Sequence, residues 1–541
     1  MKTKPILAII AALMVALATP TGTPETAQAQ TGPIKLNHSL AGFDTVEDYT
    51  LSPDSRLVAY CARVSGVLSL WITPIDGSTA AGQVPGISTC ASSWTWIGAD
   101  GGALMLGNAN PYPSSASIPT LVETTAPYAS RPLFTLPAGF VSYRQIRWSQ
   151  DGQWIFFSAG QTSVGQFAVF VAPASGAQPA RQLTPTIAAG QGGAWDFEVT
   201  PDLSRLIVVS DELIPGTSEL IGRTLPSDLL TGALDAPQRL SGPMATGGDV
   251  GFYGGGGTGT LLTFEVTPDL SRVVYFADQE ADNDRALYNV PLSGSATPVR
   301  LSPPLGAGTD FSWIWTPSFG YARYMVQDLT TYRTSIFRAP VAGPASATTL
   351  MVDNGSNIGF SPSGGGFRGV LSGGRYAGNV LQIILSIGPF GGQPAAYVPI
   401  TAPAPSGVTY TSPDGNTLTF TSVGTDLHRI DLSAANVQAV PLTGVTGAYP
   451  ILLSNYRVVY GNSTTLYSRP LYGNNTTNQP INGATAFSGS GALVRLAGND
   501  HWVVFRTATA PSVYELFATD LGSPRVNLPI QTYLPDLRLA R

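Results

Sequence analysis

Residues 197–205 read Phe-Glu-Val-Thr-Pro-Asp-Leu-Ser-Arg, and the same nine letters recur at 264–272. The Pro of this stretch fixes the backbone at the first corner of a tight turn, and the Asp side chain bonds the backbone that follows it. Apolar residues come before the turn, and a β-branched or aromatic run follows it. The stretch therefore predicts two antiparallel strands joined by a short hairpin turn.

Looser copies of this hairpin occur along most of the chain, for example at 51–60, 148–157 and 411–420. A third apolar stretch follows and ends in a Pro-x-x-Gly turn, as at 291–294. A fourth short stretch then closes the unit, as at 298–302. Four antiparallel strands in each unit are typical of a β-propeller blade.

Turn positions mark about ten copies of the unit, at residues 54, 100, 151, 202, 269, 318, 365, 414, 455 and 500. Their spacing of 41 to 67 residues is close to the roughly 40 to 50 residues of a blade. The longest interval contains the glycine-rich stretch 247–259, which we expect to form a surface loop.

The stretch 267–294 resembles the TolB-type, WD40-like propeller repeat. It combines Thr-Pro-Asp-x-Ser-Arg with Val-Val-Tyr-Phe-Ala-Asp-Gln-Glu-Ala-Asp-Asn and Leu-Tyr-Asn-Val-Pro-Leu-Ser-Gly. The resemblance covers 44–305 well and 405–445 moderately, and it implies an all-β propeller. The repeats begin soon after the N-terminal segment, with no room for the α/β domain of TolB, so the partner role of TolB is not carried over.

Ten units exceed the four to eight blades of a typical propeller. We therefore predict two tandem propellers, at 30–305 and 306–541, with one large ring as the alternative. Residues 33–37, Pro-Ile-Lys-Leu-Asn, favour the alternative because they resemble the closing strand at 298–302. Such an N-terminal strand would complete a blade that begins elsewhere in the chain.

Residues 1–29 read as a signal peptide, with Lys2 and Lys4 before an apolar run at 6–17 and a small-x-small cleavage site at 27–29. We expect a secreted, periplasmic or cell-surface protein with no membrane insertion after cleavage; an uncleaved anchor is the alternative. Removal of the segment changes 28 basic and 34 acidic residues to 26 and 33. The acidic balance argues against a nucleic-acid partner.

Cys61 and Cys90 are the two cysteines of the chain. In an oxidising compartment such an isolated pair is expected to form one disulfide. Two separate buried thiols are the alternative, because spacing alone does not show that the two Cα atoms lie within bonding distance.

The sequence carries no complete catalytic or metal motif. Gly359-Phe360-Ser361-Pro362-Ser363 lacks the last glycine of a nucleophile elbow. Three scattered histidines, His38, His428 and His501, do not have the spacing of a zinc site. The acidic run 278–284 would suit calcium, but a solvated hairpin explains it better. We expect no cofactor.

Two tryptophan pairs are the candidate binding residues: Trp94 with Trp96, and Trp313 with Trp315. Residues two apart on a strand share a face, so each pair forms an apolar platform. Packing between blades is the simpler interpretation, and stacking on a sugar or peptide is the alternative.

Three functions remain open. The preferred hypothesis is a non-enzymatic scaffold that binds a protein or cell-envelope polymer. The alternatives are a polysaccharide lyase or glycosidase centred on the channel, and a structural surface-layer component. An enzyme of that kind needs carboxylates that converge from different blades. The carboxylates to inspect lie near predicted first strands: Glu47, Asp48, Asp196, Glu198, Glu265 and Asp310.

Overall fold

A computed structural model gives the fold of most of the chain. It describes residues 33–40, 44–87, 94–97, 101–106, 119–161, 166–185, 193–194, 196–251, 263–305, 308–318, 320–362, 368–377, 380–389, 398–399, 405–412, 417–422, 427–432, 439–442, 449–453, 457–461, 465–471, 478–483, 493–497, 501–510 and 513–521. These residues form nine antiparallel sheets and one 3-10 turn, Ala345–Ala347. None of the described residues belongs to a helix long and apolar enough to cross a membrane.

The sheets follow one another along the chain. The first sheet consists of β2(Thr45–Leu51), β3(Leu57–Val64), β4(Val67–Pro74) and β5(Gly82–Gln83). The second consists of β6(Trp94–Ile97), β7(Ala103–Leu106), β8(Thr120–Glu123) and β9(Ser130–Pro132). The third consists of β10(Ser142–Trp148), β11(Trp154–Gly160), β12(Phe167–Pro173) and β13(Arg181–Gln182). The next two are β14(Asp196–Val199), β15(Arg205–Ser210), β16(Glu219–Thr224) and β17(Gln238–Arg239), then β18(Phe264–Val266), β19(Arg272–Ala277), β20(Ala286–Pro291) and β21(Val299–Arg300).

The sixth sheet has seven strands: β22(Thr309–Ser318), β23(Tyr321–Asp328), β24(Thr334–Pro340), β25(Thr349–Pro362), β26(Arg368–Ala377), β27(Val380–Pro389) and β28(Val398–Pro399). Its long strand β25 closes one four-stranded unit and opens the next. Two four-stranded sheets follow: β29(Pro405–Thr411), β30(Thr417–Ser422), β31(Leu427–Asp431) and β32(Ala439–Pro441), then β33(Tyr449–Leu453), β34(Arg457–Gly461), β35(Leu466–Pro470) and β36(Gln479–Pro480). The described strands thus contain the ten predicted units, in nine sheets.

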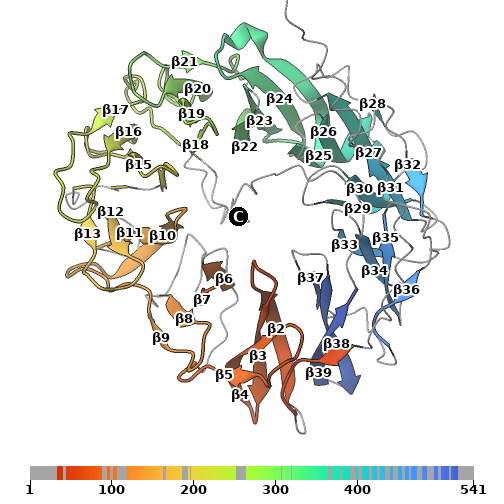
Figure 1. The fold of residues 1–541 in the computed structure, drawn as a ribbon. Helices are drawn as coiled ribbons and strands as arrows, with labels where there is room; N and C mark the ends of the chain where they lie inside the picture. Colours follow the sequence, from red (N-terminus) through yellow and green to blue (C-terminus); the bar gives the residue numbers. More distant parts are fainter. Residues whose placement is uncertain are drawn as a thin grey trace, which may run out of the picture.

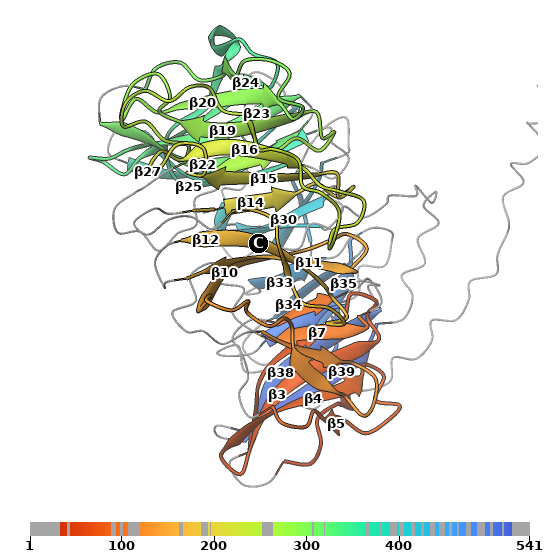
Figure 2. The ribbon, with the colours of Figure 1, turned by 90° about the vertical axis from the view of Figure 1, so that its left-hand side faces the viewer.

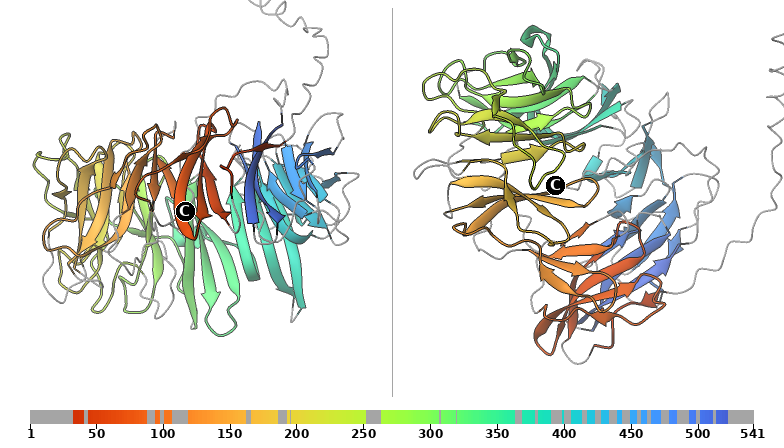
Figure 3. Two further views of the ribbon diagram at one scale, coloured as in Figure 1. Left: turned by 90° about the horizontal axis from the view of Figure 1, so that it is seen from below. Right: turned by 60° about the vertical axis from the view of Figure 1, so that its left-hand side comes forward.

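The sheets stand side by side around one ring, and in the eight sheets described above the first strand is innermost (Figure 1). Figure 2 shows neighbouring sheets stacked along the ring, and Figure 3 shows their strands crossing its thickness. This is the single large ring that the sequence left as the alternative, rather than two tandem propellers. The predicted boundary near 305 is bridged by packing of Phe276 on Phe311, with ring centroids 4.4 Å apart. The domain bounds 30–305 and 306–541 stay a prediction.

The ring is closed by the N-terminal strand β1(Ile34–Lys35). It pairs with β39(Val513–Asp520), which is followed inward by β38(Trp502–Ala510) and β37(Leu493–Leu496). Beyond β1, the amide of Leu36 donates to the carbonyl of Leu516 at 2.9 Å, and the Asn37 side chain accepts the Leu516 amide at 2.9 Å. The sequence predicted a closing strand here, and the structure shows which blade it completes.

The fourth strand of a blade is fixed by one repeated hydrogen bond. A Ser, Thr or Asn that follows a buried Leu or Ile accepts an amide of the third strand. Five side chains make this bond: Asn37, Thr184, Ser241, Ser302 and Asn482. After the N-terminal strand, Asn37 makes the same hydrogen bond as the Ser, Thr or Asn of the internal blades, which explains why this strand fits the closing position.

The apolar core lies between neighbouring sheets. One cluster combines Phe156 of β11 with Phe197 of β14, and another combines Val274 of β19 with Tyr324 of β23. The cluster that contains Leu36 joins the closing sheet to the first complete sheet, β2 to β5. Because two neighbouring sheets form each of these clusters, a ring without closure would expose apolar surface on its two end sheets.

The predicted hairpin turns join the first and second strands. In five of them the hydroxyl of the leading Ser or Thr accepts the amide five residues later, at 2.9 to 3.0 Å: Ser52, Ser149, Thr200, Thr267 and Ser412. In the first four of these turns the fourth residue has a positive φ: Ser55, Gly152, Leu203 and Leu270. The turn chemistry that the sequence predicted is therefore confirmed.

Gly152→Ala isolates the backbone requirement of this turn. Gly152 has φ +69, and an added Cβ would meet nothing within 4 Å. We expect a loss of about 1 kcal/mol in the free energy of unfolding, from the left-handed conformation alone. Gly294→Ala should cost more, because its Cβ would also overlap the side chain of Gln238. Urea denaturation measures both losses. If Gly152→Ala and Gly294→Ala lost the same free energy of unfolding, the contact with Gln238 would not add to the cost at Gly294.

The turn carboxylates make stability sensitive to acid. Hydroxyl donors two residues earlier lower the pKa of Asp151, Asp202 and Asp269 below the usual 3.8. Since the folded pKa lies below the unfolded pKa, this stabilisation is complete above about pH 4 and is lost as pH falls through the folded value. We expect the melting temperature to fall below pH 4, and less steeply after substitution of all three by Asn. If the melting temperature of the triple variant fell with pH as steeply as that of the parent, these three carboxylates would not be the source of the acid sensitivity.

Candidate functional site

The two faces of the ring differ in their connections. Because every unit runs from its inner to its outer strand, the turns between first and second strands all lie on one face. The connections between second and third strands, and those between sheets, lie on the other, which we call the connection face. On the first face the turns 52–56, 149–153, 200–204 and 267–271 are all five residues long. Other links on this face differ: the link between β22 and β23 has two residues, and the link 225–237 between β16 and β17 has thirteen.

The connection face is irregular. Among the links between second and third strands whose residues are all described, the lengths range from the two residues 65–66 to the eight residues 211–218. Exposed apolar side chains stand on or beside these links: Val67, Ile214, Leu329 and Tyr332. Loops that vary in length and composition on a rigid scaffold are the usual place of binding residues. Sequence reasoning missed these four residues, although the unequal lengths of the links could have signalled them.

The link 329–333 holds its apolar side chains in a fixed turn. The Asp328 carboxylate accepts the amides of Thr330 and Thr331, both at 2.8 Å. The Tyr332 amide donates to the Asp328 carbonyl at 2.8 Å, and the Leu329 amide donates to the Gly308 carbonyl at 2.9 Å. Tyr332 is 72% exposed. An aromatic side chain presented in this way loses little conformational entropy when it binds a partner.

The acidic run 278–284 packs against the segment that precedes the glycine-rich stretch. The Asp278 carboxylate accepts the amides of Asp249 and Asn283. Burial, with the charge of Asp278 nearby, raises the pKa of Asp249. Within the described residues no group of three or more His, Cys, Asp or Glu could hold a metal. Most of the glycine-rich stretch, from residue 252 on, lies outside the described residues.

The carboxylates proposed for a channel-centred enzyme take part in contacts between and within blades. Asp310 of β22 pairs with Arg285 of the preceding sheet. Asp48 of β2 lies 3.8 Å from Arg495 of the closing sheet. Asp196 accepts the Thr263 hydroxyl at 3.0 Å.

The remaining three carboxylates lie on the same inner strands. Glu47 pairs with Arg63 of its own sheet at 3.0 Å. Glu198 lies on β14, and Glu265 is buried on β18. A neutral seam of the same kind joins β10 to β14, where the Gln145 amide exchanges two hydrogen bonds of 3.1 Å with the backbone of Phe197. Gln145 therefore connects adjacent blades, as Asp310, Asp48 and Asp196 do.

The first tryptophan pair packs between blades. Trp94 and Trp96 lie on β6 and contact the core cluster that includes Leu70 and Val122. The Trp96 indole nitrogen donates to the Thr50 hydroxyl of the neighbouring sheet at 3.1 Å. This geometry favours the packing interpretation. Trp313 and Trp315 lie on the equivalent first strand β22, but their side chains are outside the described part of the chain.

Cys61 is fully buried in β3 and is disulfide-bonded. Cys90, the only other cysteine, lies outside the described residues, so the pairing stays a prediction. His38 stacks on Trp71 with ring centroids 3.9 Å apart, and its Nδ1 lies 3.1 Å from the Tyr60 hydroxyl. Burial lowers the pKa of His38. This histidine anchors the segment after β1.

Nine sheets around a closed ring define the architecture. The fold is a β-propeller. No protein-family model and no curated protein matches the chain. Among solved structures, one of two analysed prolyl endopeptidases is 11% identical with a TM-score of 0.35, over 81% of this chain and 58% of that one. Oligopeptidase B from Leishmania major is 9% identical with a TM-score of 0.36, over 86% and 54%.

Two further solved structures are also similar to this propeller. An oligogalacturonate lyase in complex with manganese is 10% identical with a TM-score of 0.32, over 80% of this chain and 99% of that one. The β-propeller domain of the Trilobed protease from Pyrococcus furiosus is 10% identical with a TM-score of 0.29, over 63% and 98%. This chain thus spans little more than half of the two peptidases. At these values the similarity carries no argument about activity.

Proposed function

We propose that the chain is an exported, non-enzymatic propeller scaffold that binds a protein or cell-envelope polymer through the connection face. The exposed apolar side chains of the connection face carry the proposal. Its links between second and third strands present Ile214, Leu329 and Tyr332 to solvent. Exposed apolar and aromatic side chains on the loops of a rigid scaffold are typical of a binding surface.

The inner strands support the non-enzymatic part of the proposal. A glycosidase needs one carboxylic acid and one free carboxylate aimed at the same bond. Here Asp310 and Asp48 lie beside arginines of neighbouring sheets, and Asp196 accepts a threonine hydroxyl. These three side chains already serve as links between blades. The TolB-like repeat and the signal-like residues 1–29 support an exported propeller of this type.

Affinity capture with matched variants tests the proposal. The mature chain, residues 30–541, is immobilised and exposed to the envelope and secreted fractions of its host. Bound proteins are identified by mass spectrometry and bound glycans by sugar analysis. The double variant Leu329→Ser/Tyr332→Ser removes the apolar tip of one link. The control Val299→Ser/Val440→Ser removes exposed apolar side chains from outer strands of the ring.

We expect one protein or polymer to be enriched by the parent and by the outer-strand control, and to be lost with the tip variant. Equal capture by all three proteins would place the binding surface elsewhere. Turnover of an anionic polysaccharide that is abolished by Asp48→Asn or Asp310→Asn would instead overturn the non-enzymatic assignment.

A further inference from the structure

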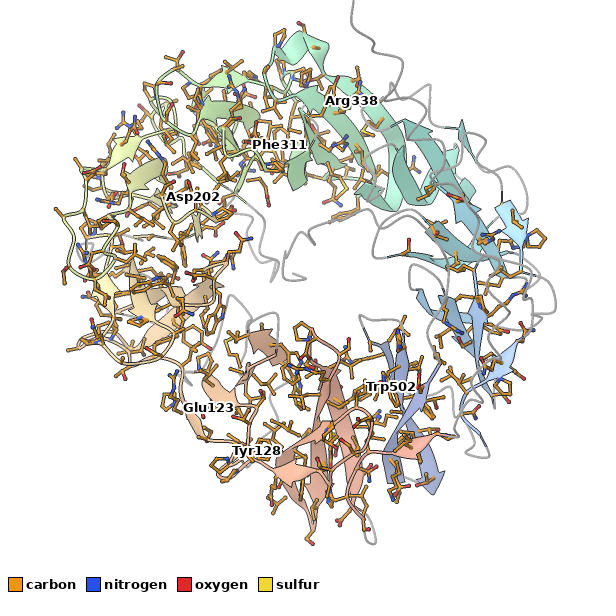
Figure 4. All side chains as sticks on the ribbon, in the orientation of Figure 1. Glu123, Tyr128, Asp202, Phe311, Arg338 and Trp502 are labelled. Atoms are coloured by element: carbon orange, nitrogen blue, oxygen red, sulfur yellow. The ribbon has the colours of Figure 1, made fainter. Side chains whose placement is uncertain are left out.

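The closing segment, residues 33–38, is attached to both sheets at the seam that completes the ring. On one side Asn37 bonds β39 of the closing sheet. On the other side the His38 ring stacks on Trp71 of β4, with ring centroids 3.9 Å apart and planes 20° apart. Trp71 packs on the same apolar cluster as Trp502 of β38, which is labelled in Figure 4. His38 is therefore the polar contact of the closing segment with the first complete sheet.

The Tyr60 hydroxyl of β3 holds the His38 ring in place. The His38 amide donates to this hydroxyl at 3.3 Å, and Nδ1 of the ring lies 3.1 Å from it. Since the amide can only donate, the hydroxyl hydrogen has an acceptor here only if Nδ1 carries no proton. The hydrogen-bond network therefore assigns the neutral imidazole, with its hydrogen on Nε2. Nε2 is buried and has no hydrogen-bond partner.

A second proton on the ring would disrupt this arrangement. Nδ1 would become a donor, and the hydrogen of the buried Tyr60 hydroxyl would lose its acceptor. The added charge would lie on a ring whose other nitrogen is buried without a partner. Burial of a charge is costly unless the charge is paired and hydrogen-bonded. Protonation of His38 should therefore weaken its contact with the first complete sheet.

The charged groups around His38 act in both directions. Burial is the main cause that lowers the pKa of His38, and the nearby charge of Lys35 also lowers it. Asp44, which precedes β2, raises the pKa of His38. Lys35 pairs with Glu515, and Asp44 accepts the Ser65 amide at 2.6 Å. Because the pKa of His38 in the closed ring lies below its ordinary value of 6.5, the imidazole is neutral at pH 7.

We propose that His38 makes closure of the ring sensitive to mild acid: a proton on its imidazole releases the closing segment from the first complete sheet. In a released segment His38 has its ordinary pKa of 6.5, so release takes up a proton. Closure is then complete above about pH 7 and weakens as pH falls through 6.5 toward the lower pKa of the closed ring. The turn carboxylates act only below about pH 4. The device does not depend on the proposed binding face.

Amide hydrogen exchange of the mature protein, residues 30–541, tests the device. The Leu516 amide reports closure, because its acceptor is the Asn37 side chain. The Val169 amide is the internal reference, because it donates to Thr184 in the same way at 2.8 Å, in a sheet whose sequence has no histidine. Each exchange rate is divided by the intrinsic rate at the same pH. Relative to Val169, the protection of Leu516 should fall up to about tenfold between about pH 7.5 and about pH 5.5.

Matched variants assign the response. Phenylalanine keeps a ring on Trp71 but takes up no proton, so His38→Phe should show equal relative protection of Leu516 at both pH values. His428→Gln and His501→Gln remove the other two imidazoles of the chain and should respond as the parent does. An NMR titration of the His38 ring in the parent gives its pKa directly, whether or not His38→Phe folds. We expect that pKa to lie below 6.5.

Three results would overturn the proposal. The first is a parent whose relative Leu516 protection is the same at both pH values. The second is a loss of protection that persists in His38→Phe, because another group would then carry the response. The third is a His38 pKa above 6.5, because the Trp71 face and Asp44 would then stabilise the imidazolium and acid would strengthen closure.

Discussion

A chain without residues 33–38 will lose much of its stability and will associate through the exposed edge of β39. The deletion removes β1 and its two backbone pairs with Ala518 and Phe517. It also removes Leu36, which is buried between the closing sheet and the first complete sheet. Truncation of one such buried leucine to alanine costs about 2 to 5 kcal/mol, so the deletion should cost at least that much. An unpaired strand edge then invites pairing with a second chain.

Thermal unfolding and light scattering measure these two effects. A synthetic peptide of residues 32–40, added in trans, should occupy the empty position and restore the melting temperature. Lys35→Ala is the matched control within the same strand: it removes only the ion pair with Glu515, in which Lys35 is 40% exposed. That change should cost less than about 1 kcal/mol. A deletion variant as stable and monomeric as the parent would mean that the ring does not need its closing strand.

Sequence reasoning located the units of this fold but not their closure. Each predicted turn position falls at or next to a link between a first and a second strand, even where the Pro-Asp pair is missing, as at 455 and 500. The reason is local: the Ser or Thr and Asp side chains accept backbone amides within five residues, and Pro fixes the backbone at the first corner. The number of rings depends instead on the angle between neighbouring sheets. That angle is set by side chains far apart in sequence, such as Phe276 and Phe311.

The candidate site was predicted less well, and for a related reason. Tryptophans and carboxylates were chosen as candidate site residues because their side chains can stack on ligands or transfer protons. In the structure, however, Trp96 and Asp310 connect neighbouring sheets. Whether such a residue faces a partner or another blade depends on its neighbours in space. Tyr332 carries no motif, and only its exposure distinguishes it. The closing strand could be found because its final asparagine makes the same hydrogen bond as the serines of internal blades.

Arg223→Met will destabilise the protein by about 3 to 5 kcal/mol, the usual result of leaving one partner of a buried ion pair alone. Arg223 of β16 lies 2.7 Å from Glu212 in the link between β15 and β16, and the two side chains are 7% and 1% exposed. The Arg223 guanidinium also donates to the Asp235 carbonyl at 3.3 Å. Without the guanidinium, the Glu212 carboxylate would be buried beside no cation.

The double variant Glu212→Met/Arg223→Met should recover most of this loss, because two apolar side chains can fill the space of a buried ion pair. Equilibrium urea denaturation of the parent, both single variants and the double variant gives the coupling between the two residues. Arg56→Met is the exposed control: its pair with Asp54 leaves Arg56 74% exposed, and its loss should cost under about 1 kcal/mol. Additive losses for Glu212 and Arg223 would show that the pair does not act as a unit.

The same pair bears on binding, since the link that it braces presents Ile214 on the connection face. In Arg223→Met, amide hydrogen exchange should therefore accelerate across 211–218 before the rest of the ring opens. Capture of the partner should weaken if Ile214 contributes to the binding surface, and Ile214→Ser should weaken it to the same extent without the loss of stability. Binding that is unchanged in both variants would restrict the proposed surface to the links of other blades.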